Sequence, residues 1–133
     1  MAFKDAAEVR TYLGGVFERA FADPEIGPKL KSTGIVLKTV YTDPEAIVII
    51  DTTSGEVREG DAASESTAEM AMTADTGNAY WQGKVNLPLA MAKSKIKVQG
   101  NVASLLKLAP LGKKLYPSYI ETLKADGRDD LLV

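Results

Sequence analysis

Apolar residues recur at helical spacing near the start of the chain. After Asp5 they fall on one helix face, at Val9, Tyr12, Leu13, Val16, Phe17, Ala20 and Phe21. This spacing predicts an amphipathic helix. Asp5 suits its cap, and Asp23 suits its end, because the residue before a proline avoids the α region. Residues 24–33 predict one or two further helical turns, interrupted at Gly27-Pro28.

The middle of the chain has the pattern of β-strands. Residues 34–41 and 46–51 form two apolar runs joined by an Asp-Pro turn, and we expect them to pair antiparallel. Residues 56–59 form a short charged strand that suits a sheet edge. Residues 64–72 alternate and place Ala68, Met70 and Met72 on one face. One face of the sheet is therefore expected to be covered by apolar side chains.

The last third of the chain mixes short helices with one more strand. We expect a helix over residues 87–93, with proline near its start, and a strand over residues 93–100, with Ile96 and Val98 on one side. Asn101 suits the cap of the next helix, which we expect to break at residues 110–112 and to break again at Pro117. This order predicts one α+β domain over residues 1–133, with helices packed on one face of a mostly antiparallel sheet.

Composition narrows the possible chemistry. The 133 residues, 45% apolar and 26% charged, fit one globular domain, and the first ten residues lack the apolar segment of a secretory signal. We therefore expect a cytoplasmic protein. The chain has no Cys and no His, so disulfides, thiolate catalysis, the commonest general base and the usual nitrogen ligand of zinc are all missing. We expect neither an enzyme nor a bound cofactor or metal.

Charge is segregated along the chain. Residues 1–83 carry 7 Lys/Arg and 14 Asp/Glu, whereas residues 84–124 carry 8 lysines and one glutamate. The lysines are either ordinary solvated positions or a patch for anionic headgroups and transient contact with an anionic membrane. We expect no nucleic-acid partner, because aromatic residues are not interleaved with the basic ones. The seven lysines of the possible patch are Lys84, Lys93, Lys95, Lys97, Lys107, Lys113 and Lys114.

Residues 73–111 carry a family resemblance. Their motifs, in order, are an acidic turn into a helix, Gly83-Lys84, an alanine-rich short helix, Lys95-Ile96-Lys97-Val98, and Gly100-Asn101 opening an apolar helix. This segment resembles the core of the sterol carrier protein 2 (SCP2) sterol-binding domain family, and the upstream order of elements extends the likeness over nearly the whole chain. One departure is Ser94, where the family often has glycine.

The resemblance implies a five-stranded sheet and helices that enclose an apolar tunnel. The tunnel would take up a sterol, a fatty acid or a fatty acyl-coenzyme A for non-catalytic binding and transfer. The wall residues that it implies are Trp81, Val85, Leu87, Leu89, Met91, Ile96, Val98, Val102, Leu105, Leu106, Leu108 and Leu111. The alternation of the methionine strand adds Met70 and Met72. Close-packed core is the other interpretation of each of these positions.

An enzyme on a similar α+β fold is the alternative. A steroid or polyketide isomerase or dehydratase needs a buried carboxylate base beside a tyrosine or a second acid. The two candidate pairs are Asp75 with Tyr80 and Asp51 with Tyr41. A helix cap and a charge at a strand end are the competing interpretations of these carboxylates.

Overall fold

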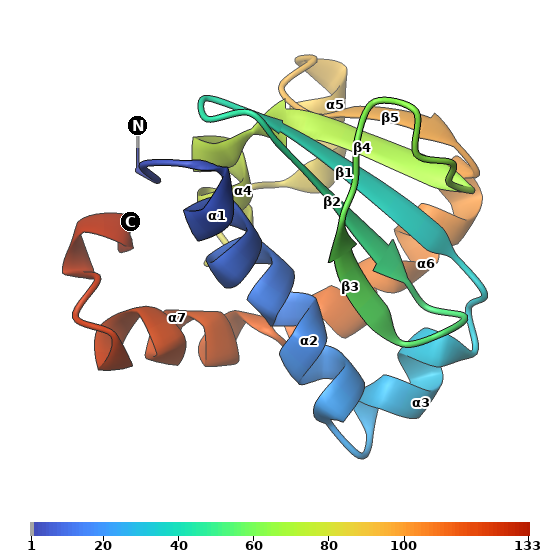
Figure 1. The fold of residues 1–133 in the computed structure, drawn as a ribbon, viewed down its shortest axis with the longest axis horizontal. Coiled ribbons are helices and arrows are strands. Elements are labelled where there is room, and N and C mark those ends of the chain that lie inside the picture. Colours follow the sequence, from blue (N-terminus) through green and yellow to red (C-terminus); the bar gives the residue numbers. More distant parts are fainter. Residues whose placement is uncertain (1) are drawn as a thin grey trace.

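The computed structural model describes residues 2–133. The N-terminal segments α1, η1 and α2 follow one another without interruption as a single long helix, and η1 is a π-helical stretch within it (Figure 1). In order, the elements are α1 (Ala6–Val9), η1 (Arg10–Gly14), α2 (Gly15–Ala22), α3 (Ile26–Lys31), β1 (Val36–Thr42), β2 (Ala46–Asp51), β3 (Glu56–Glu59), β4 (Ala68–Thr73), α4 (Ala74–Tyr80), α5 (Leu87–Ala92), β5 (Lys97–Gly100), α6 (Val102–Lys113), α7 (Tyr116–Ala125) and η2 (Asp129–Leu131).

The five strands form one mixed sheet in the order β3-β2-β1-β4-β5. The pairs β1–β2, β2–β3 and β4–β5 are antiparallel, and β1–β4 at the centre is parallel. The predicted α+β fold with a five-stranded, mostly antiparallel sheet is therefore confirmed. The charged strand β3 lies at a sheet edge, as its sequence predicts.

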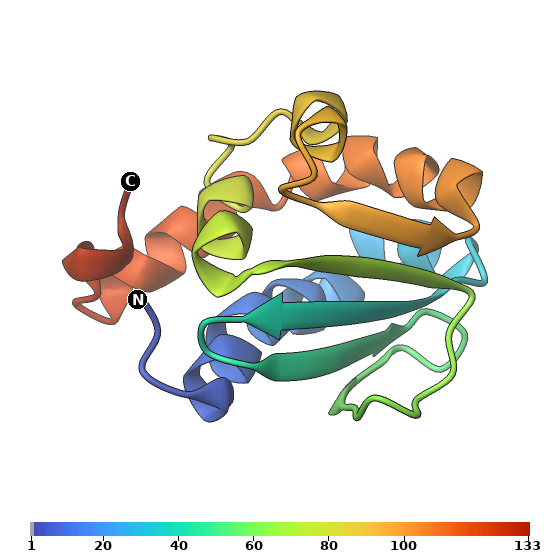
Figure 2. The ribbon, with the colours of Figure 1, turned by 90° about the horizontal axis from the view of Figure 1, so that it is seen from above.

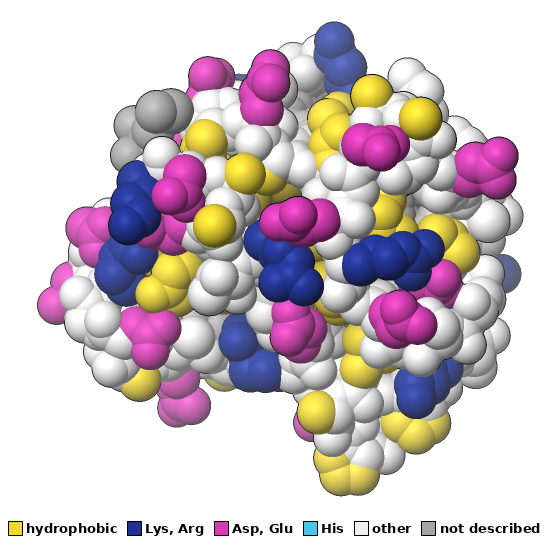
Figure 3. All heavy atoms as spheres, in the orientation of Figure 1, with side chains coloured by type: hydrophobic (Ala, Val, Ile, Leu, Met, Phe, Trp, Pro, Cys, Tyr) yellow, Lys and Arg dark blue, Asp and Glu magenta, His cyan; other side chains and the backbone are white. Residues whose placement is uncertain are grey.

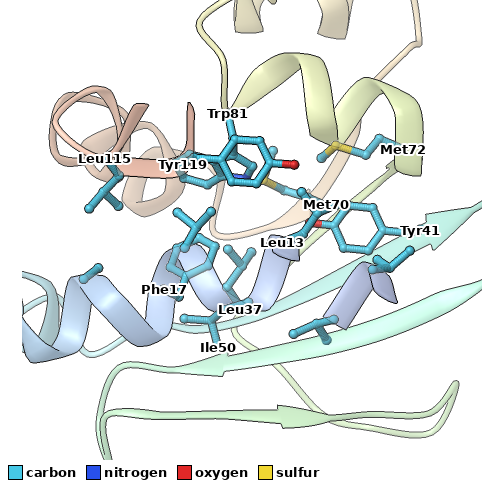
Figure 4. Packing of buried hydrophobic residues seen from close by; sticks show 14 of the residues in the cluster. Leu13, Phe17, Leu37, Tyr41, Ile50, Met70, Met72, Trp81, Leu115 and Tyr119 are labelled. Atoms are coloured by element: carbon cyan, nitrogen blue, oxygen red, sulfur yellow. The ribbon is translucent and has the colours of Figure 1, made fainter. Parts of the chain in front are cut away.

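One face of the sheet packs against the helices and forms the core. Leu37 and Tyr41 of β1 and Met70 and Met72 of β4 are buried on this face, in agreement with the alternation of the sequence. Figure 4 shows these side chains directed toward Leu13 and Phe17 of the N-terminal helix. Figure 2 shows α2 and α3 behind the sheet, and α7 with both chain ends at one end of the molecule.

A loop covers part of the opposite face of the sheet. Lys38 of β1 is buried there, and its ammonium group donates to the carbonyl oxygens of Ala62 (2.9 Å) and Ser64 (3.2 Å). The Glu69 carboxylate lies 3.7 Å from the same group. A buried charge is tolerated only when it is paired and hydrogen-bonded, and these three partners meet that need.

The prolines of the last two helices do not act as predicted. Helix α6 runs through Pro110 to Lys113, so the expected break at residues 110–112 is wrong. Pro110 and Leu106 are both exposed, so water can bond the Leu106 carbonyl that lacks an N–H partner. Pro117 lies in the first turn of α7, where no N–H is needed, and therefore starts a helix instead of breaking one.

Ser94 occupies a position that favours glycine. Its φ of 58° lies in the left-handed region, between the end of α5 and strand β5. Serine therefore adopts here the left-handed conformation that glycine adopts without steric cost.

Gly100 at the end of β5 has a stronger requirement for glycine. Its φ is +82°, and an added Cβ would lie 2.5 Å from the carbonyl oxygen of Thr67, the residue just before β4. We expect Gly100→Ala to lower the free energy of unfolding by about 2 to 3 kcal/mol, because a backbone atom cannot move aside cheaply.

Gly34 provides the matched control for this substitution. It has φ +66° but nothing within 4 Å of an added Cβ. Gly34→Ala should therefore cost only about 1 kcal/mol for the left-handed conformation. Urea unfolding of both variants measures the difference, and equal losses would contradict the steric argument.

Candidate functional site

An apolar chamber lies between the inner face of the sheet and the helices. Its volume is about 50 Å³, which has room for a few water-sized groups. The wall is drawn from α2, α3, α4, α5 and α6, from the residues that follow α4 and α6, and from strands β1 and β4. Its residues are Phe17, Ile26, Leu30, Leu37, Met70, Tyr80, Trp81, Leu87, Leu105, Leu108, Ala109, Leu111, Gly112 and Leu115.

Trp81 is the aromatic centre of this wall. It follows α4, whose N-terminus is capped by the Thr73 hydroxyl, and it is 7% exposed. Its ring meets Phe17 edge-on with centroids 5.3 Å apart, and meets Tyr80 and Tyr116 at 5.2 and 6.1 Å. Such edge-to-face pairs are favourable, so the indole is held at a fixed place beside the chamber.

Six of the predicted wall residues meet in the chamber. They are Met70, Trp81, Leu87, Leu105, Leu108 and Leu111. They come from β4, the end of α4, α5 and α6, and the fold is what brings these segments together. Their part in lipid binding stays a prediction.

The other eight predicted residues lie elsewhere. Met72 and Ile96 are buried in the core, and Met91, Val98 and Val102 are half-buried. Val85, Leu89 and Leu106 border clefts on the outside, where Leu89 is 52% and Leu106 45% exposed. Their spacing identifies apolar positions correctly but does not separate chamber, solid core and surface.

The rest of the chamber wall was not predicted. Phe17, Ile26 and Leu30 come from the N-terminal helices, and Leu37 comes from β1. Phe17 and Leu37 lie on apolar faces that the periodicity does identify. Which of these faces adjoins the chamber depends on packing between segments distant in sequence, and the pattern alone carries no such signal.

Two clefts open beside the chamber. The one that we call the outer cleft measures about 540 Å³ and shares Tyr80, Leu87 and Ala109 with the chamber wall. The second, the side cleft, measures about 400 Å³ and is bordered by Lys84, Lys93 and Lys95. The shared residues show that the outer cleft adjoins the chamber.

Helix α6 contributes the largest number of lining residues to the chamber but has few buried residues of its own. Within the described chain, Leu105 and Gly112 are the only fully buried residues among its twelve. Its remaining leucines are half-buried or exposed, although the helix is mostly apolar. Few of the residues of α6 are therefore held in the core.

The two carboxylate–tyrosine pairs are not assembled. Asp51 is paired in register with Val36 and Tyr41 with Ala46, so the two lie at opposite ends of the β1–β2 ladder. The hydrogen bond from the Thr53 hydroxyl lowers the pKa of Asp51, which makes it a weaker base. Burial raises the pKa of Tyr41 to about 12.

The second pair is separated in a different way. Asp75 is exposed and accepts a hydrogen bond from the Ala2 amide at 2.9 Å, whereas Tyr80 faces the chamber. Within residues 2–133, no carboxylate lines the chamber. An enzyme with a buried carboxylate base therefore finds no support in this geometry.

The fold and the chamber together define a class of α+β domain, in which a sheet and its helices close around an apolar compartment. The family model of the SCP-2 sterol transfer family matches residues 16–113. The chain belongs to this family. A comparison with curated proteins found no match.

Solved structures share the fold. The sterol carrier protein domain 2 of Helicoverpa armigera has a TM-score of 0.67 at 21% identity, over 82% of this chain and 88% of that one. Apo sterol carrier protein 2 of Yarrowia lipolytica has a TM-score of 0.66 at 16% identity, over 87% and 98%. Aedes aegypti sterol carrier protein 2, in complex with the C16 fatty acid palmitate, has a TM-score of 0.58 at 21% identity, over 84% and 96%.

The described helices were also compared with the requirements of a membrane span. None of those within residues 2–133 is both long and apolar enough to cross a bilayer.

Proposed function

We propose that this protein binds one lipid in the chamber and transfers it without catalysis. The observation that carries the proposal is a chamber lined almost entirely by apolar side chains, with the Tyr80 hydroxyl and the Trp81 indole N–H as the polar side-chain groups among its described lining residues. The candidate ligands are a sterol, a fatty acid or a fatty acyl-coenzyme A. Membership of the SCP-2 sterol transfer family and the palmitate complex of the Aedes aegypti protein support this choice.

Apolar burial supplies the binding energy in this proposal. Each methylene moved from water into the chamber contributes about 0.8 kcal/mol, and part of the sum is offset by the lost freedom of the ligand. Few polar groups line the wall, so chain length matters more than chemical detail. Broad specificity among long-chain lipids follows.

Loading requires the chamber to expand. A chamber of about 50 Å³, with room for only a few water-sized groups, cannot hold an acyl chain of about 16 carbons. Outward movement of α6, which has few buried residues, is the proposed way to gain the space. The adaptable side chain of Met70 helps the wall to follow the ligand.

Transient membrane contact is the second part of the proposal. Lys84, Lys93 and Lys113 surround the clefts, where Leu89 and Leu106 are exposed. Near an anionic bilayer each such lysine contributes about 1 kcal/mol. Figure 3 shows another face of the molecule, the one that carries α1, α2 and β3. Acidic and basic side chains are intermingled on that face, so it is not a basic surface.

Energy transfer from Trp81 tests the proposal. Trp81 is the only tryptophan, so its emission reports on the chamber wall alone. We expect a dansyl-labelled fatty acid to quench this emission at micromolar concentrations, and transfer from phosphatidylglycerol vesicles to exceed transfer from phosphatidylcholine vesicles at low salt. Unchanged emission, together with no lipid in extracts of the purified protein, would reject lipid binding. Equal transfer from both vesicles would reject the membrane contact.

A further inference from the structure

The outer cleft has a chemical character that differs from that of the chamber. The chamber wall is apolar, whereas the outer cleft is bordered by the ammonium groups of Lys84 and Lys113 and by the Asn86 amide. Within the described chain, its border includes no Asp or Glu. Positive charge therefore lies in the cleft that adjoins the chamber.

The two lysines are available for a ligand. They are exposed, and among residues 2–133 neither has a carboxylate within ion-pair distance. The neighbouring Lys114 is different, because it pairs with Glu25 at 3.5 Å. Both lysines border the cleft, Lys84 from the loop after α4 and Lys113 from the end of α6.

Aromatic packing holds the two sides of this cleft together. Tyr116, at the start of α7, lies 3.2 Å from the position of an added Cβ on Gly83, the residue before Lys84. Its ring also meets the Tyr80 ring edge-on with centroids 6.2 Å apart. The loop that carries Lys84 is thereby fixed near the C-terminal end of α6, which carries Lys113.

We propose that the outer cleft is a headgroup subsite, in which Lys84 and Lys113 bind the carboxylate or phosphate of an amphipath whose chain enters the chamber. The proposal rests on the function proposed above and makes it specific. It selects anionic lipids over neutral ones, because a hydroxyl headgroup can accept a hydrogen bond from an ammonium group but carries no negative charge to pair with it. In this proposal α6 contacts both parts of the ligand: its leucines contact the chain and Lys113 contacts the headgroup.

Competition among matched ligands tests the subsite. Dodecanoate, dodecyl phosphate and dodecanol share one chain, and each can displace the dansyl fatty acid from the wild-type protein and from a Lys84→Gln/Lys113→Gln variant. We expect the double variant to lose about tenfold in affinity for the two anions and less than about twofold for the alcohol. Added salt should lower the affinity of the wild-type protein for the two anions, since the cleft is open to solvent and salt screens exposed charges.

A second double variant controls for net charge. Lys97→Gln/Lys107→Gln removes the same charge from residues that do not border the outer cleft, and it should change all three affinities by less than about twofold. Equal losses for anions and alcohol, or equal losses in both double variants, would overturn the subsite. If none of the three ligands binds the wild type, the proposed function fails first and the subsite fails with it. Unfolding curves establish that both variants are folded.

Discussion

Gly112→Leu is expected to lower lipid affinity at least tenfold. Gly112 lines the chamber from α6, and an added Cβ would lie 3.6 Å from the Trp81 ring. A leucine side chain extends three carbons beyond that Cβ, into a space of only about 50 Å³. The added atoms occupy the place of the first methylenes of the ligand, and overpacking opposes their displacement. Titration with the dansyl fatty acid measures the loss.

Gly112→Ala is the control for the loss of lipid affinity expected from Gly112→Leu. Its Cβ makes an ordinary van der Waals contact with Trp81, so lipid affinity should change little. Replacing a helical glycine by alanine should stabilise the fold by up to about 1 kcal/mol, which a urea titration detects. If the leucine variant is folded and binds lipid as tightly as the wild type, the chamber is not the binding site.

Local pattern was enough to predict most elements of the fold. The helical spacing from Val9 to Phe21 and the alternation from Ala68 to Met72 each depend on neighbours a few residues apart. The parallel pairing of β1 with β4 is different, because it joins residues such as Leu37 and Ala68 across a long stretch of chain. Periodicity gives the faces of elements and leaves open which faces meet.

The chamber could be predicted only in part for the same reason. Leu105 and Leu106 are adjacent leucines on one helix, yet the first lines the chamber and the second is exposed. An apolar helix that faces two ways suggests a compartment, but it does not say which side is inside. The family resemblance points to residues 73–111, which contribute part of the chamber wall, and packing against α2, α3, β1 and β4 adds further wall residues.

A buried polar network near the chamber escaped the sequence patterns altogether. Asn78 and Gln82 are 2% and 6% exposed, and their side-chain amides donate to the Leu131 carbonyl oxygen at 2.8 and 2.9 Å. The Tyr119 hydroxyl donates to the side-chain Oδ1 of Asn78 at 2.6 Å. Burial raises the pKa of Tyr119, which keeps the hydroxyl protonated and able to donate. The network thus joins α4, α7 and the C-terminal segment.

Asn78→Ala is expected to lower the free energy of unfolding by about 3 kcal/mol. The substitution leaves the Tyr119 hydroxyl, which is 0% exposed, without its acceptor, and a buried donor that loses its partner costs about 1 to 3 kcal/mol beyond the lost packing. Gln82 still satisfies the Leu131 carbonyl, so the C-terminal segment should stay docked. Urea unfolding measures the loss.

Tyr119→Phe gives the matched comparison for that network. This substitution removes the donor and keeps the ring. The side-chain Oδ1 of Asn78 still accepts a hydrogen bond from the Gln82 amide at 3.1 Å. We therefore expect the free energy of unfolding to fall by only about 1 kcal/mol. In the double variant Asn78→Ala/Tyr119→Phe no stranded hydroxyl remains. Its loss should therefore fall below the sum of the two single losses. Strict additivity would show that the 2.6 Å hydrogen bond does not couple α4 to α7.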